Sequence, residues 1–319
     1  PNVIYHAAHV LLKSVDRGFN WTEASPDLTR DEEDKQGKGS GPYTNENIEQ
    51  YNTIFAFAES PHDAATLWVG TDDGLVHITR DGGESWTEVT PRGIGRGLVN
   101  SIEASPHEPG VAYVVAMKYK VGDNRPYVWR TVNYGRSWTS IAGGLPEEHF
   151  VRVVREDPER EGLLFAGMER GLYVSFNSGQ DWRPFQTNLP VVPITDLMLR
   201  RNDLVLATQG RSFWVIDDIA PLRQYRQEDE QAVLQLYAPS PAVRLTPTNG
   251  RNSGGESSAP SAPHGAIIYY ALAEDASLEE QGLKIEILDN DGMVLRTLET
   301  DEETGIEGGG SDTAYALPA

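Results

Sequence analysis

Two adjacent carboxylates, Asp72 and Asp73, are the residues of this sequence that most resemble an acid–base couple. Neighbouring carboxyl groups can separate in pKa, so that one is protonated while the other is ionised. Hydrolysis of a glycosidic bond needs two carboxyl groups that face each other at about 5 Å or at roughly 6.5–9.5 Å. Adjacent residues at a strand end point apart. Asp72 and Asp73 are therefore catalytic candidates whose facing geometry the sequence does not supply.

Further polar residues occupy turns equivalent to the one that holds this pair. The predicted ligand-binding residues are Asp72, Asp73, Glu169, Arg170, Gln209 and Arg211. Carboxylates and guanidinium groups gathered on one face can bind a sugar or a carboxylate ligand through bidentate hydrogen bonds. The same face is expected to hold a loop insertion, Lys118 to Pro126, and the connection residues Arg92, Arg96 and His149. For each position taken singly, an ordinary solvated turn residue is the alternative.

The elements that must position these residues are indicated by a turn that occurs four times. Its copies are Ser14–Trp21, Thr79–Trp86, Thr131–Trp138 and Ser175–Trp182, each with the pattern hydroxyl, any, Asp or Asn, any, Gly, any, any, Trp. The residues expected to shape the turns are Asp16, Gly18, Trp21, Asp81, Gly83, Trp86, Asn133, Gly135, Trp138, Asn177, Gly179 and Trp182. The Asp or Asn side chain can accept backbone N–H groups, and glycine supplies a positive φ.

The tryptophan of each turn begins a strand, and we expect its ring to lie back over its own hairpin and bury apolar area. The acidic position is Asp in two copies and Asn in two copies. A catalytic carboxylate would not be exchanged freely for an amide. The turns are therefore interpreted as structural.

The sequence around the turns repeats as well, with three short β-rich runs before each of the last three turns and a short strand after them. A fifth unit lacks the tryptophan turn but keeps the runs Pro193–Leu199, Leu204–Thr208 and Ser212–Asp217. Four strands in a unit that repeats every few tens of residues are typical of β-propeller blades. We predict an all-β chain, with a partial propeller of about five four-stranded blades over residues 1–226.

In such a blade the turns between strands 2 and 3 emerge on the same face as the connections between blades, whereas the tryptophan turns emerge on the other. Ligands of propellers commonly bind where loops from several blades converge. We therefore expect the site on the loop-rich face and not on the face of the tryptophan turns.

The four turns resemble the Asp-boxes, or bacterial neuraminidase repeats, of sialidases, xyloglucan-type glycoside hydrolases and sortilin-family receptors. Two phrases, Ser14 to Thr29 and Ala207 to Leu222, resemble the large exported bacterial proteins of sortilin-like, twin-propeller type that are often labelled glycosyl hydrolases. The resemblance covers about residues 1 to 225. It implies an exported, extracellular or periplasmic bacterial protein that binds a glycan, peptide or protein, or acts as a scaffold. The alternative is a glycoside hydrolase-like enzyme. The three arginines and the Tyr–Glu pair of sialidases cannot be assigned.

The composition restricts the classes of partner and of chemical site that this chain can have. A net charge of −21 over 319 residues argues against nucleic acid and anionic membranes. Because the chain has no cysteine, it has no disulfides, thiol nucleophiles or thiolate metal sites. No cofactor and no metal site are predicted, since His6 and His9 lack further ligands. No apolar run is long enough for a membrane span. The start at Pro1 suggests a piece of a longer protein, with further blades supplied by a missing segment or another chain.

The rest of the sequence differs in composition. Residues 227–263 are predicted as a connecting segment that includes a Pro-, Ser- and Gly-rich linker from Thr246 to Pro263. Residues 264–319 resemble part of an immunoglobulin-like β module. Two alternating runs, Leu283–Leu288 and Met293–Leu298, flank Asp289-Asn290-Asp291-Gly292 and predict a β-hairpin. A calcium loop is the less favoured alternative, because no acidic residue closes it.

Overall fold

The computed structural model describes residues 2–32, 35, 51–228, 232–242, 265–273, 282–301 and 305–306. The chain divides into two compact units, one ending at Ile219 and the other covering Ala220–Ala316, apart from the last three residues. The boundary thus falls a few residues before the predicted position 226. No helix in the part of the chain that the structure describes has the length and apolar character needed to cross a membrane.

The first unit consists of five consecutive antiparallel sheets, which we call blades 1 to 5, and in each the strands follow chain order. Blade 1 holds β1 (Ile4–Ala7), β2 (Leu11–Ser14) and β3 (Thr22–Glu23), and blade 2 holds β4 (Ile54–Glu59), β5 (Leu67–Thr71), β6 (Val76–Thr79) and β7 (Thr87–Glu88). Blade 3 holds β8 (Leu98–Ala104), β9 (Ala112–Lys118), β10 (Asp123–Thr131) and β11 (Thr139–Ser140). Blade 4 holds β12 (Val151–Glu156), β13 (Leu164–Met168), β14 (Gly171–Ser175) and β15 (Arg183–Pro184), and blade 5 holds β16 (Ile194–Arg200), β17 (Asp203–Thr208) and β18 (Phe213–Ile216).

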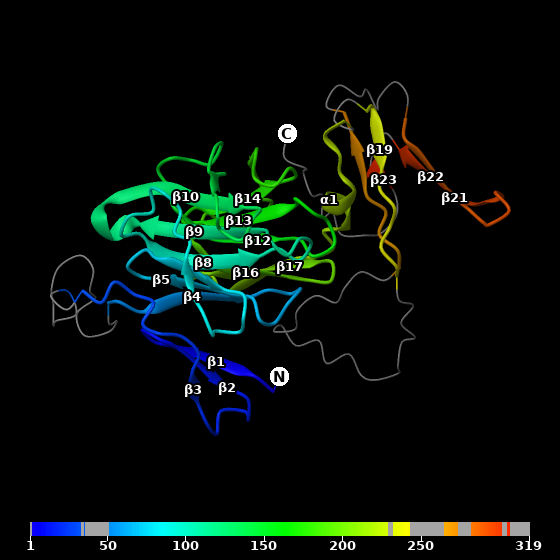
Figure 1. Ribbon diagram of the computed structural model, residues 1–319. Coiled ribbons are helices and arrows are strands. Elements are labelled where there is room, and N and C mark those ends of the chain that lie inside the picture. Colours follow the sequence, from blue (N-terminus) through cyan, green and yellow to red (C-terminus); the bar gives the residue numbers. More distant parts are fainter. Residues whose placement is uncertain are drawn as a thin grey trace, which may run out of the picture. The chain divides into compact units, whose positions relative to one another are not determined.

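These sheets form a partial β-propeller, as predicted. Blades 2 to 4 have four strands, whereas blades 1 and 5 have three among the described residues. The first strands of neighbouring blades, β4, β8, β12 and β16, lie side by side in chain order (Figure 1). In the three complete blades, the first strand is therefore the innermost and the short fourth strand is the outermost.

The core lies between the blades, because the sheets of blades 2 to 4 each lie between two neighbouring blades. The second strands β5 and β13 are buried at every position, and β9 is buried at every position but its last. This explains their continuous apolar sequence. Two glycines in these strands allow close packing. A Cβ at Gly167 would lie 2.8 Å from Ile194 of blade 5, and one at Gly70 would overlap Val99 of blade 3.

The four tryptophan turns share one hydrogen-bond pattern. The first hydroxyl accepts the N–H of the glycine at 2.7–3.0 Å, as in Thr79 with Gly83. The Asp or Asn oxygen accepts the N–H four residues on at 2.9 Å. The Asp or Asn side chain makes a second hydrogen bond, with the side chain of the residue four positions on, and this bond explains why either residue type can occur. Asp16 accepts from the Asn20 amide, whereas Asn177 donates to the Asp181 carboxylate.

Three of the four tryptophan rings do not close their own hairpins, contrary to our expectation. Three of them reach the preceding blade, where each indole Nε1 donates to the carbonyl oxygen of the residue that follows the outermost strand. The pairs are Trp86 with Ala24 at 2.9 Å, Trp138 with Val89 at 2.6 Å and Trp182 with Ile141 at 2.7 Å. The turn glycine packs on the same residue. We call each such contact a Trp joint. Trp21 instead donates to Gly18 of its own turn and is 41% exposed.

The predicted loop insertion from Lys118 to Pro126 is mostly regular structure. A 3-10 helix, Tyr119–Val121, and Gly122 at φ +78° connect β9 to β10, which already begins at Asp123. The register shifts between Asp123 and Tyr127, where the pairing with β9 is irregular. Both strands therefore continue beyond the sheet into a hairpin extension.

The second unit is described by itself. It contains α1 (Ala220–Gln224), a strand pair of β19 (Leu234–Leu236) with β20 (Tyr270–Leu272), and a three-stranded sheet of β21 (Lys284–Leu288), β22 (Val294–Asp301) and β23 (Gly305–Ile306). The turn between β21 and β22 is stabilised by Asp289, whose Oδ1 accepts the backbone N–H groups of Asp291 and Met293. This oxygen closes a hairpin. The predicted linker Thr246–Pro263 lies outside the described residues.

Candidate functional site

The turn that holds Asp72 and Asp73 connects β5 to β6 and gives the two carboxylates different environments. Asp73 is fully buried. Its oxygens accept the backbone N–H of Arg30 at 2.7 Å, the amide of Asn52 at 2.5 Å and the hydroxyl of Thr71 at 2.5 Å. The carboxylate of Asp73 thus holds the segment that connects blades 1 and 2 against the β5–β6 turn. It has no exposed surface for a ligand.

The side chain of Asp72 has different hydrogen-bond partners from that of Asp73. It accepts the backbone N–H of Thr53 at 2.9 Å and contacts the Thr53 hydroxyl at 3.4 Å. Burial raises the pKa of Asp72 to about 6, and the charge of Asp73 adds to the rise. The backbone hydrogen bond from Thr53 opposes it. Asp72 is therefore a carboxyl group that changes charge near neutral pH.

Asp72 lines a small pocket of about 20 Å³ on the loop-rich face between blades 2 and 3. The other lining residues combine one phenol, three cations and three apolar side chains, namely Tyr51, Arg96, Lys118, Lys120, Leu98, Met117 and Val121. We call this the Asp72 pocket. The pocket is large enough to hold about one water molecule.

Two of the three cations of the Asp72 pocket, Arg96 and Lys118, are held in place by other residues. Arg96 forms an ion pair with Glu32, whose pKa is lowered mainly by this hydrogen bond. Lys118 donates from Nζ to the carbonyl of Gly93 at 2.6 Å and lies 4.1 Å from the ring centroid of Tyr127. Burial lowers the pKa of Lys118. Burial also raises the pKa of Tyr51 to about 12, so its hydroxyl stays protonated.

The structure does not bring the other predicted ligand residues into the Asp72 pocket. Glu169 is engaged by Arg152 of β12, whose guanidinium donates to it at 2.6 and 2.8 Å. Arg170 is exposed beside it, and Gln209 and Arg211 are exposed in the turn between β17 and β18. Of the connection residues, Arg96 lines the pocket. Arg92 does not, and instead lines a groove beside Trp138.

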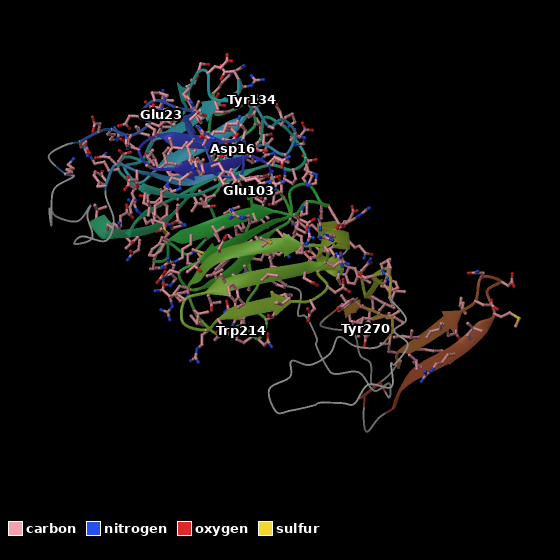
Figure 2. All side chains as sticks on the ribbon, turned by 90° about the horizontal axis from the view of Figure 1, so that it is seen from below. Asp16, Glu23, Glu103, Tyr134, Trp214 and Tyr270 are labelled. Carbon is pink, nitrogen blue, oxygen red and sulfur yellow. The ribbon has the colours of Figure 1, made fainter. Side chains whose placement is uncertain are left out.

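A second polar cluster lies on the innermost strands, where sequence reasoning did not look. Arg155 of β12 donates to Ser101 at 2.9 Å and to Asp196 of β16 at 2.9 Å, and its Nη1 is 3.5 Å from Glu103 of β8. Glu103 is labelled near the middle of the blades in Figure 2. Burial raises the pKa of Glu103 to about 7, and Arg155 opposes the rise. The sequence feature that could have indicated this cluster is Glu103, a charged residue within the strand β8.

The described lining of the Asp72 pocket does not contain the pair of facing carboxyl groups that was considered for hydrolysis. Asp72 is the one carboxylate that lines the pocket, and the described lining holds no second carboxylate across from it. Among the described residues, no group of three or more His, Asp or Glu side chains is arranged to hold a metal ion.

Comparison with known proteins supports the fold. The chain is similar to a GH74 xyloglucanase from Xanthomonas campestris, with 20% identity, a TM-score of 0.51, and coverage of 69% of this chain and 36% of that one. It is also similar to YCF48 from Cyanidioschyzon merolae, with 18% identity, a TM-score of 0.39, and coverage of 52% and 53%. No family model and no curated protein matches.

The chain thus spans between about a third and a half of the length of these two solved structures. At such identities the likeness describes a propeller fold and no activity.

Proposed function

We propose that this chain is the ligand-binding part of an exported bacterial propeller protein, and that it binds a peptide or protein segment at the Asp72 pocket. The observation that carries the proposal is the lining, in which Arg96, Lys118 and Lys120 stand beside an aliphatic wall. The segment would place a carboxylate against the cations and an aliphatic side chain against the wall.

Charge and preformed packing support this class of ligand. Lys118 and Lys120 line the pocket in addition to Arg96, which is paired with Glu32, and Asp72 is the one carboxyl group in the lining. Leu98 and Met117 are buried and pack with Phe150, so the apolar wall is preformed.

A peptide array probed with the full-length protein tests the proposal. We expect peptides with Asp or Glu next to Leu, Ile or Val to bind, and Lys120→Gln to weaken that binding at least fivefold. Arg211→Gln is the matched control, because Arg211 is exposed and does not line the pocket. Equal loss in both variants, or no acidic peptide among the binders, would contradict the proposal.

A glycoside hydrolase is the second candidate, and the Glu103 cluster is the observation that favours it. A carboxyl group with a pKa of about 7 is suited to act as a general acid, and Asp196 provides a second carboxylate on the next inner strand but one. Release of reducing ends from xyloglucan by the full-length protein, abolished by Glu103→Gln, would support this candidate. Absence of release over a panel of polysaccharides would exclude those substrates.

A further inference from the structure

The outer rim of the propeller holds a groove of about 560 Å³ at the Trp joint between blades 2 and 3. Its lining includes Arg92, Arg136, Trp138, Ser137, Thr90 and Glu88. The groove does not share a lining residue with the Asp72 pocket. We call it the joint groove.

Two features make the joint groove suited to an anion. Arg92 and Arg136 are both exposed, and neither guanidinium makes a hydrogen bond or ion pair with another residue in the described ranges. Arg96, Arg152 and Arg155, in contrast, are all held by carboxylates. In an acidic chain, two unengaged guanidinium groups on one groove provide donors for an oxyanion. Glu88 is the one carboxylate in the lining.

The other two Trp joints serve as internal comparisons, because the register makes their positions equivalent. Val89, Ala24 and Ile141 each follow an outermost strand and accept the indole N–H, and Arg92 lies three residues after Val89. The equivalents of Arg92 and Arg136 are Asp27 and Glu84 in the joint of blades 1 and 2, and Gly144 and Gln180 in the joint of blades 3 and 4. Repeated turn structure therefore does not require these arginines.

The aromatic wall of the joint groove distinguishes a sugar from a peptide strand. Trp138 is only partly buried, whereas the equivalent Trp182 is 6% exposed. The Nε1 of Trp138 donates a hydrogen bond to the Val89 carbonyl. The ring packs edge-on against Trp68, with 6.1 Å between the ring centroids. The ring is therefore held rigidly at the groove, where a sugar ring can stack on it. The hydroxyls of Thr90, Ser137 and Ser140 add hydrogen-bonding groups.

The joint groove offers fewer contacts to an extended peptide than to a sugar chain. The outermost strands at the groove, β7 and β11, are two residues long each, so they offer a short backbone ladder for strand addition. The groove also lacks an aliphatic side-chain pocket, since Val89 is the one aliphatic residue in its lining. Its volume exceeds that of the Asp72 pocket and suits several sugar units.

We propose that the joint groove is a binding site for an acidic glycan, in which Arg92 and Arg136 bind carboxylate or sulfate groups and Trp138 stacks on a sugar ring. The groove combines residues of the third tryptophan turn with residues of the connection between blades 2 and 3, and it shares no lining residue with the Asp72 pocket. The proposal does not depend on the peptide-binding function proposed for the Asp72 pocket.

Calorimetric titration of the full chain with hexagalacturonate and with a heparin-derived hexasaccharide tests the site. We expect at least one to bind, and binding to weaken with added salt because the contacts are ionic. The double variant Arg92→Gln/Arg136→Gln should lose at least tenfold in affinity with an unchanged thermal unfolding midpoint, since both side chains are exposed. Arg200→Gln removes one exposed charge from blade 5 and should leave affinity unchanged.

Two ligand controls fix the class. The methyl ester of hexagalacturonate keeps the sugar backbone without its charge and should not bind. Polyglutamate keeps the charge without sugar rings and should bind at least tenfold more weakly. Binding of neither acidic hexasaccharide would overturn the proposal. So would equal affinity for polyglutamate, equal loss in Arg200→Gln, or unchanged affinity in the double variant.

Discussion

Trp138 of blade 3 donates its indole N–H to the carbonyl oxygen of Val89, 2.6 Å away at the end of blade 2. Gly135 of the same turn packs on the side chain of Val89, so the glycine and the tryptophan of the turn both contact this one residue of blade 2. The same relation recurs at Ala24 and Ile141. The tryptophan turns therefore bind blades to one another, and the stability of the propeller depends on them.

Replacement of Trp138 by Phe should destabilise the propeller by about 1–3 kcal/mol, because the Val89 carbonyl loses its donor in a partly buried joint. Urea unfolding followed by circular dichroism measures this loss. Trp21→Phe is the matched control, since Trp21 donates within its own turn and is largely exposed. Equal destabilisation by the two variants would show that the joint contributes nothing beyond the turn itself.

The glycines of one turn type should respond differently to alanine. Gly135→Ala introduces a Cβ that would lie 2.7 Å from Val89 Cβ at φ +79°, so both overlap and backbone strain oppose it. We expect a loss of about 2–4 kcal/mol. Gly82→Ala carries the strain of φ +75° without any neighbour within 4 Å and should cost about 1 kcal/mol. Thermal unfolding of both variants measures the difference, and similar values would refute the steric contribution.

Exchange of Asn for Asp should depend on the residue four positions on. Asn177 donates to the Asp181 carboxylate, so Asn177→Asp would place two carboxylates together and destabilise the protein by about 0.5–1 kcal/mol at low salt. Asn133 donates to the Ser137 hydroxyl, which can reverse its role, so Asn133→Asp should be close to neutral. Unfolding at low and high salt distinguishes the two, because only the first effect should fade with salt.

Glu103 should make stability depend on pH. Its folded pKa of about 7 lies above the ordinary value of 4.5, so the folded state holds the proton more tightly. The free energy of unfolding therefore falls as pH rises from about 4.5 to 7, by roughly 1–2 kcal/mol after allowance for partial solvation. Glu103→Gln mimics the protonated form and should reduce this fall. Denaturant titrations at pH 5 and pH 7.5 test it, and an equal pH dependence in the variant would contradict the assignment.

The repeated turns could be interpreted from the sequence because their hydrogen bonds close within a few residues. Thr79, Asp81 and Gly83 bond to one another or to the next residues of the same turn, so spacing alone indicates the geometry. The short β-rich runs likewise predicted strands, and the structure shows that β5 and β13 are buried along their whole length. The prediction of a partial propeller is confirmed on these grounds.

The candidate sites could not be predicted in the same way. Asp72 and Asp73 are neighbours in the chain, yet one lines a pocket and the other is fully buried, because Arg30 and Asn52 enclose Asp73 from a distant segment. Arg92 and Arg96 are four residues apart but line different cavities. The placement of Glu169, Arg170, Gln209 and Arg211 in a common site remains a prediction.

The sequence by itself determined the blades and the internal bonding of their turns, since both depend on short-range periodicity and local hydrogen bonds. The packing of blade on blade decided the rest. It places the Trp138 indole against the Val89 carbonyl, brings Arg92 and Arg136 into one groove, and places Glu103 and Asp196 on either side of Arg155. These partners come from different blades, and no local pattern specifies which of them will meet.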